Sequence, residues 1–396
     1  MLLFTDNAGM TALHEAACDG NLGILLKIWE WAEEKLTTEE VNSKLLLARD
    51  NEGMTAWHWA AYEGKLDILL QIWEWAEERL TREEMSNKLL LFTDNAGMTA
   101  LHEAACEGNL DVLLKVWEWA EEKLTIEEIK TKLLLATDNE EWTTWHYAAL
   151  EGNLDILLKI WEWADEKLTK EDINSKFLLA TDSEGMTAWH WAAHEGKLDV
   201  LLQVWEWAEE KLTMKDINCK LILATDNEGR TALHEAAKLG DLDILLKVWE
   251  WAQEKLTTED LNSKFLLATD NEGMTAWHCA ACEGNLDILQ KLWNWAEEKL
   301  TKEEINNKLL LATDIEGRTA WHRAAYVGNL DVLQKLWNWA EEKLTREERN
   351  NLFLVTDNEG KTIWHVVAKD GTLEIFLKLL FWAIQKLTDR KKIINN

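Results

Sequence analysis

The chain has 396 residues, a net charge of −31 and 47% hydrophobic residues. This acidity excludes a nucleic-acid backbone as the expected partner, because carboxylates and phosphates repel each other. No apolar run reaches the roughly 18 residues that a membrane-spanning helix needs, and the first ten residues lack the basic and apolar regions of a secretory signal.

The sequence repeats itself every 44 residues. Each copy opens with an aspartate, and a histidine follows eight residues later. The aspartates are Asp6, Asp50, Asp94, Asp138, Asp182, Asp226, Asp270, Asp314 and Asp357, the last of which comes one residue early. A fixed period of this length is typical of one helical unit stacked many times. We therefore expect residues 1–396 to form a single all-α solenoid of nine repeats that start near residues 6, 50, 94, 138, 182, 226, 270, 314 and 357.

The third copy shows the first predicted elements of a repeat. Residues 94–97 read Asp-Asn-Ala-Gly, which is the composition of a tight turn. Thr99 caps the short helix that follows, and Gly108 is expected to end it in the left-handed conformation. The turn glycine is present in eight copies, but the fourth has Glu141 instead, so we expect a strained turn there.

A longer second helix is predicted to begin at Asn109, a favourable N-cap residue. Its apolar side chains cover about two-thirds of the circumference, so we expect it to be buried on several sides. Trp117 lies near the centre of this apolar arc and Trp119 at its rim. Trp119 therefore either packs in the core or faces a partner. Thr125 and Glu128 form a capping-box pattern that predicts a third helix over residues 125–135.

Two short segments of each copy resemble a known repeat family. Residues 99–105 read Thr-Ala-Leu-His-Glu-Ala-Ala and residues 108–110 read Gly-Asn-Leu. This resembles the ankyrin signature Thr-Pro-Leu-His-x-Ala-Ala followed by Gly-x-Leu, and it recurs nine times. The chain departs from the family in having no proline and a period of 44 rather than 33. The resemblance implies an extended ankyrin variety with an added third helix. A HEAT or armadillo array fits the period, but the Thr-x-x-His motif disfavours it.

The nine register histidines are the main candidates for chemistry. Since 44-residue spacing supplies one histidine per layer, it does not gather the ligands of a metal site. The resemblance implies instead that each histidine and threonine tie the turn to the helix. Cys279 and Cys282 occupy separately variable positions without a second ligand pair, which favours chance substitution. We predict no catalytic residue, no metal and no cofactor.

Three positions vary between copies while the rest of the repeat is nearly constant. They are the turn tip, the residue after the histidine, and the position three residues further on. On a helical wheel they share the face opposite the core, which in ankyrin arrays is the concave, partner-binding face. The predicted partner-binding residues are Trp59, Tyr62, Trp142, Tyr147, Trp191, His194, Arg230, Lys238, Arg318, Arg323 and Tyr326.

The expected function is a non-catalytic scaffold for protein–protein interaction. The alternative is a self-assembling array that uses an uncapped N-terminal end, residues 1–4, since the helix from residue 373 resembles a polar cap that closes with residues 389–392. The chain is thus expected to be a monomer or an end-to-end oligomer. Its acidity either keeps the array soluble or selects a basic partner. Five scattered cysteines fit a reducing cytoplasm.

Overall fold

The computed structural model describes residues 3–394, without the side chains of Asp370 and residues 385–394. Over that range it contains 26 α-helices and seven π-helical turns, with no β-strand beyond an isolated bridge between Thr313 and Thr319. The predicted all-α repeat solenoid is confirmed. Contacts divide the chain into unit 1, residues 1–213, and unit 2, residues 214–396.

Unit 1 repeats a three-helix pattern. The first helices are α1 (Ala12–Cys18), α4 (Ala56–Tyr62), α7 (Ala100–Cys106), α10 (Thr144–Glu151) and α13 (Ala188–His194). The second helices are α2 (Leu22–Lys35), α5 (Leu66–Arg79), α8 (Leu110–Lys123), α11 (Leu154–Lys167) and α14 (Leu198–Lys211). The third are α3 (Thr38–Val41), α6 (Arg82–Met85), α9 (Ile126–Ile129) and α12 (Lys170–Asp172), continued by π-helical turns η1 (Asn42–Leu46), η2 (Ser86–Leu90), η3 (Lys130–Leu134) and η4 (Ile173–Phe177).

Unit 2 follows the same pattern from the third helix of the fifth repeat. The first helices are α16 (Ala232–Leu239), α19 (Ala276–Glu283), α22 (Ala320–Val327) and α25 (Ile363–Asp370). The second helices are α17 (Leu242–Lys255), α20 (Leu286–Lys299), α23 (Leu330–Lys343) and α26 (Leu373–Ile394). The third are α15 (Met214–Ile217), α18 (Thr258–Asp260), α21 (Lys302–Ile305) and α24 (Arg346–Leu352), with π-helical turns η5 (Asn218–Ile222), η6 (Leu261–Leu266) and η7 (Asn306–Leu310).

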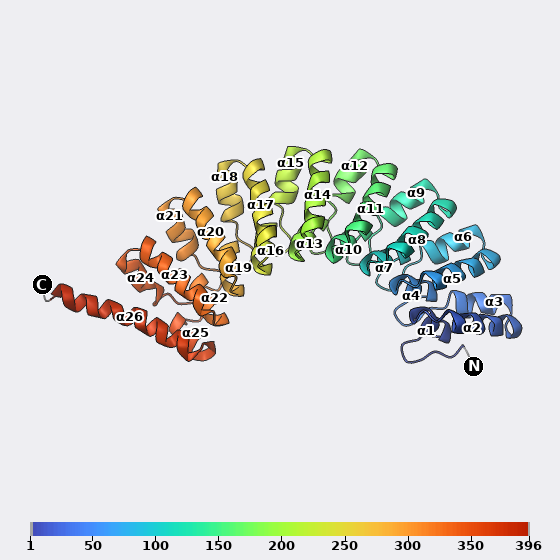
Figure 1. The fold of residues 1–396 in the computed structure, drawn as a ribbon, viewed down its shortest axis with the longest axis horizontal. Helices are drawn as coiled ribbons and strands as arrows, with labels where there is room; N and C mark the ends of the chain where they lie inside the picture. Colours follow the sequence, from blue (N-terminus) through green and yellow to red (C-terminus); the bar gives the residue numbers. More distant parts are fainter. Residues whose placement is uncertain (1–2, 395–396) are drawn as a thin grey trace. The chain divides into compact units, whose positions relative to one another are not determined.

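Each repeat packs on its neighbours through corresponding helices. In unit 1 the first helices contact one another in sequence from α1 to α13, and in unit 2 from α16 to α25. Within each unit the first helices lie along one edge and the third helices along the opposite edge (Figure 1). The turn tips and first helices of a unit therefore share one side of its array.

The turns are connected by an asparagine ladder. Asn95 donates its backbone N–H to Glu52 O at 2.8 Å and its side-chain amide to Asn51 O at 2.9 Å, in the preceding turn. Gly53 has φ +83°, and a Cβ atom there would lie 2.5 Å from the Asn95 Oδ1 atom. Glycine is thus required both by its conformation and by the close approach of the next turn. As expected, Glu141 has positive φ, at 64°.

Asn109 begins the second helix as predicted, but its side chain forms no cap there. Its amide donates instead to the Ala61 and Tyr62 carbonyl oxygens of the preceding repeat, at 3.1 and 2.6 Å. This asparagine therefore joins two repeats. The capping box of Thr125 and Glu128 is present as predicted.

Tryptophans of the second helices stack between neighbouring repeats. Trp117 and Trp119 are buried, with exposed fractions of 4% and 5%. The Trp73 and Trp119 rings lie 4.3 Å apart, and the Trp117 and Trp163 rings lie 4.0 Å apart. Unit 2 repeats the pattern with Trp249 on Trp295 at 4.1 Å. The core reading of Trp119 is thus confirmed, because its ring is covered by the previous repeat.

The predicted third helix is only partly regular. In the third repeat one α-helical turn, α9, passes into the wider η3 turn, in which both Leu133 and Leu134 are buried. A π-helical turn accommodates one extra residue. The eighth repeat is one residue shorter and has the regular helix α24 in this place. The early position of Asp357 therefore reflects the absence of a π-helical turn.

The predicted polar cap at the C-terminus is wrong for the described part of α26. Its exposed side chains include Leu373, Leu377 and Phe381, with exposed fractions of 73%, 53% and 53%. The predicted closing residues 389–392 lie outside the described side chains. Of the predicted N-terminal end, Met1 and Leu2 lie outside the described residues, and Phe4 is 79% exposed.

Candidate functional site

Eight of the nine register histidines are buried, and His102 illustrates their bonding. His102 Nδ1 lies 2.9 Å from Thr99 Oγ1 and accepts the Thr99 N–H at 3.2 Å. Because Nδ1 is an acceptor, the proton is on Nε2, which donates to the Ala136 carbonyl of the next turn at 3.2 Å. Burial lowers the pKa of His102 to about 4. The neutral ring therefore has both nitrogens satisfied, which is a structural role.

The turn aspartates bind the side chains of several predicted site residues. In unit 1, Trp59 donates its indole N–H to Asp50 Oδ2 at 2.8 Å, and Trp191 donates to Asp182 Oδ2 at 2.6 Å. Tyr147 donates its hydroxyl to Asp138 Oδ2 at 2.6 Å. In each case the donor lies nine residues after the aspartate. The residue after the histidine therefore fixes the turn of its own repeat.

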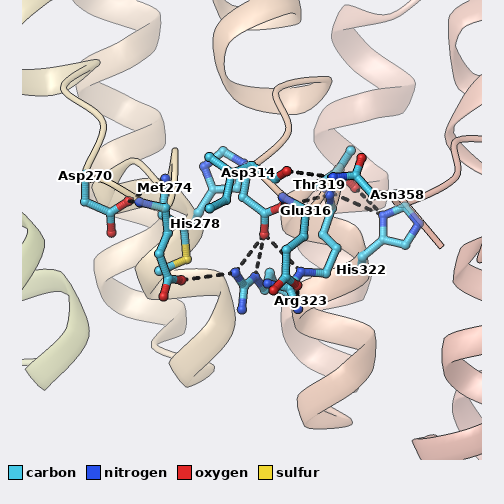
Figure 2. Close-up of polar contacts among 12 residues, drawn as sticks. Asp270, Met274, His278, Asp314, Glu316, Thr319, His322, Arg323 and Asn358 are labelled. Atoms are coloured by element: carbon cyan, nitrogen blue, oxygen red, sulfur yellow. Dashed lines mark hydrogen bonds and ion pairs between the residues drawn. The ribbon is translucent and has the colours of Figure 1, made fainter. Parts of the chain in front are cut away.

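In unit 2, arginines occupy the same carboxylate oxygen. Figure 2 shows Arg323 directed at Asp314, and its Nε donates to Asp314 Oδ2 at 2.9 Å. Arg318, at the turn tip, also donates to this oxygen, at 3.1 Å. Arg230 donates to Asp226 Oδ2 at 2.8 Å. Three of the predicted site residues are thus held by turn aspartates, two of them by the same carboxylate.

Four predicted residues of unit 1 gather into an aromatic cluster. Trp142 lies 4.6 Å from the Trp191 ring of the next repeat and 5.1 Å from the Tyr147 ring. His194 lies edge-on to Trp191 at 5.3 Å. Trp142 is buried and the other three are half-buried. Trp59 and Tyr62 form a separate, half-buried pair with ring centres 5.9 Å apart.

Predicted site residues of unit 2 line two cavities. One of about 510 Å³ is bounded by Arg318, Arg323 and Tyr326 together with residues of α25 and its turn. The other, of about 330 Å³, is bounded by Arg230 and Lys238 and by Cys279 and Cys282 of the next repeat. Lys238 is exposed, and Tyr326 is 63% exposed.

Comparison with known protein families finds a match in one repeat. Residues 272–297 match the model of the ankyrin repeat. That stretch holds the end of a turn, α19 and most of α20, and the same turn and helices recur along the chain. The array of helices is consistent with an ankyrin-like repeat protein. The chain matches no curated protein.

Among the described residues, no helix has both the length and the apolar character that a membrane span requires. The part of the chain with described side chains also has no group of three histidine, cysteine or acidic residues that could hold a metal ion. Cys279 and Cys282 are both free thiols. Burial raises the pKa of Cys279 to about 12, so its sulfur is a neutral thiol.

Sequence reasoning missed a buried acid in the third repeat. Glu103, the residue after the histidine, is 3% exposed, and its carboxyl group forms no hydrogen bond or ion pair with another described residue. Burial and the neighbouring Asp94 and Glu107 raise its pKa to about 8. In the sixth repeat the equivalent Glu235 lies 2.8 Å from Arg230 Nε. The signal in the sequence was the combination of this glutamate with methionine at the turn tip.

Glu103 should make the array less stable in alkali. Its folded pKa of about 8 lies above the ordinary value of 4.5, so the folded state holds a proton that the unfolded chain loses first. The free energy of unfolding therefore falls as pH rises from about 4.5 to 8. We expect Glu103→Gln to raise it by about 4–5 kcal/mol at pH 9 in urea denaturation.

The matched change Glu235→Gln should have the opposite sign, because it leaves Arg230 with one acidic partner fewer inside the array. We expect it to lower the free energy of unfolding by about 1–2 kcal/mol. Equal effects of the two changes would contradict this account of Glu103.

Proposed function

We propose that this ankyrin-like protein is a non-catalytic scaffold that binds a protein partner in the cytoplasm. Ankyrin repeats imply protein partners in general. The binding surface is formed by the turn tips and first helices, which are the part of the repeat that varies between copies. We also propose that residues 1–396 act as one continuous array.

One observation carries the choice of surface. In unit 2 the positions that vary also line the cavities of about 510 and 330 Å³, and each cavity lies between two neighbouring repeats. A cavity that holds arginine, lysine and tyrosine side chains suits protein recognition, because these residues combine charge with contact area. The constant positions are used instead for the core and the turn ladders.

Tyr326 is the best test of this surface. Tyr326→Ala removes a 63% exposed side chain, so it should reduce partner capture at least fivefold without changing the melting temperature. Capture would be measured with the full chain as bait in a cell lysate and quantified by mass spectrometry.

Ile126→Ala is the control, because Ile126 is an exposed apolar residue on a third helix, with an exposed fraction of 66%. It should leave capture unchanged. Equal loss with Ile126→Ala would place the interface elsewhere. A drop of several degrees in the melting temperature of Tyr326→Ala would show that Tyr326 supports the fold.

A further inference from the structure

The third and sixth repeats carry the same pair of acids. Asp94 and Glu103 in the third correspond to Asp226 and Glu235 in the sixth. In the sixth repeat an arginine of the same repeat pairs with both acids. Arg230 Nε lies 2.8 Å from Asp226 Oδ2 and 2.8 Å from Glu235 Oε1. A guanidinium group is thus the cation that this arrangement of two carboxylates accepts.

The third repeat lacks that cation. Met98 stands at the turn tip where the sixth repeat has Arg230. Asp94 Oδ1 accepts the Met98 N–H at 2.7 Å, as in the other turns. Its Oδ2, the atom that binds a side chain in five other repeats, has no such partner among the described residues. The side chain of Met98 is flexible and apolar, so it can move aside. The polar contact that it would lose is the weak one between the Tyr147 hydroxyl and its sulfur, at 3.7 Å.

Glu103 is the second half of the vacant pair. Its exposed fraction is 3%, and its carboxyl group has no bonding partner within the described part of the chain. The charged groups that act on it, Asp94, Glu107 and Glu52, are all negative. A buried carboxyl group without a partner is costly. A cation supplied from outside would remove that cost.

We propose that Asp94 and Glu103 form a binding site for an arginine side chain of the partner protein. This inference rests on the proposed scaffold function, since it names the chemistry that one part of the binding surface recognises. A guanidinium group offers several N–H donors in a fixed plane and can donate to both carboxylates at once, whereas an ammonium group acts as a point charge. The site therefore selects arginine over lysine.

The first repeat has the same residue types, but there Glu15 is exposed. Water screens an exposed carboxylate, so a cation gains little from it. Of these two pairs, only that of the third repeat has a buried glutamate.

N-acetyl-arginine amide is the probe, titrated into the full chain at 150 mM salt and followed by calorimetry. We expect the arginine amide to bind the wild-type chain. The N-acetyl amides of lysine and citrulline should bind it with at least tenfold lower affinity. Glu103→Gln should weaken it at least tenfold, and Met98→Arg should abolish it by filling the site as Arg230 does. Circular dichroism would verify that both variants are folded.

Two further variants separate the site from the general acidity of the chain. Glu235→Gln removes one negative charge from the pair that Arg230 already occupies and should leave probe binding unchanged. Arg230→Met empties that pair and should add one binding site. The proposal is overturned if the wild-type chain does not bind the probe, if citrulline amide binds equally well, or if Glu103→Gln and Glu235→Gln have equal effects. In that case Tyr326→Ala still tests the scaffold function independently.

Discussion

Acidification from pH 7 to 5 should destabilise the array through its buried histidines. Burial lowers the pKa of His58 and His102 to about 4, and it lowers the pKa of His14, His146, His234, His278 and His322 in the same direction. A proton on Nδ1 would also face the N–H of the threonine that this atom now accepts. As pH falls below about 6.5, these histidines therefore bind protons in the unfolded chain before they do so in the folded chain.

The sign follows from linkage between protonation and folding. Since the folded pKa lies below the ordinary 6.5, stability is complete above pH 6.5 and is lost as pH falls towards 4. At pH 5 His58 and His102 each lower the free energy of unfolding by about 2 kcal/mol, and the other five histidines act in the same direction. Glu103 acts in the opposite direction, but it is a single group. Denaturant titrations at pH 7 and 5 measure the sum.

A matched pair of variants assigns this effect to the buried rings. His102→Gln should reduce the slope of unfolding free energy against pH between 6.5 and 5. His365→Gln should change that slope little, because His365 has the same threonine partner but an exposed side chain. An array that is equally stable at pH 7 and 5 would contradict this account of the buried histidines.

Replacing Trp57 with alanine should lower the free energy of unfolding by about 3–5 kcal/mol. Trp57 is completely buried and contacts Trp73 of its own repeat and Trp119 of the next, at 5.8 and 5.5 Å between ring centres. Alanine would leave a cavity between two repeats, and the rings around it are themselves stacked. Urea denaturation at pH 7 measures the loss.

Trp57→Leu is the control for this core position. The same position holds Leu13, Leu101 and Leu233 in other repeats, all of them buried, so the fold accepts leucine there. The indole N–H of Trp57 has no hydrogen-bond partner among the described residues, and leucine removes this unsatisfied donor. We therefore expect a loss of about 1–2 kcal/mol for leucine. Equal losses for the two variants would show that packing volume does not decide the stability of this site.

Most of the fold could be predicted because the same turn, capping and helix residues recur in every repeat. The turn of residues 94–97, the capping residues Thr99 and Thr125 and the terminating Gly108 are local features, and local chemistry determines them. The sequence did not predict the π-helical turn, because its extra residue is present in seven repeats and so belongs to the regular period. The only sign of it in the sequence is that the eighth repeat, before Asp357, is one residue shorter. The sequence of one repeat predicts a capping side chain at Asn109. It does not show that carbonyl groups of the preceding repeat lie within reach of this amide.

The variable positions could be identified from the sequence, but the bonds of their side chains could not, and their role in partner binding stays a prediction. Variation between copies predicts which positions share a face, and Tyr326 and Lys238 are indeed exposed there. It does not tell that Trp59 and Tyr147 are held by turn aspartates. The sequence shows Asp94 and Glu103 as two acids among 73. Only burial distinguishes Glu103 from the solvated carboxylates.

The stacked tryptophans have an optical consequence. Indole rings that lie 3.9–4.6 Å apart and nearly parallel, such as Trp29 on Trp75 and Trp293 on Trp339, couple their electronic transitions. Each unit should therefore give an exciton couplet in its ultraviolet circular dichroism that single indoles do not give. Separation of two neighbouring repeats would erase the contribution of one pair, so local opening could be followed without an added label.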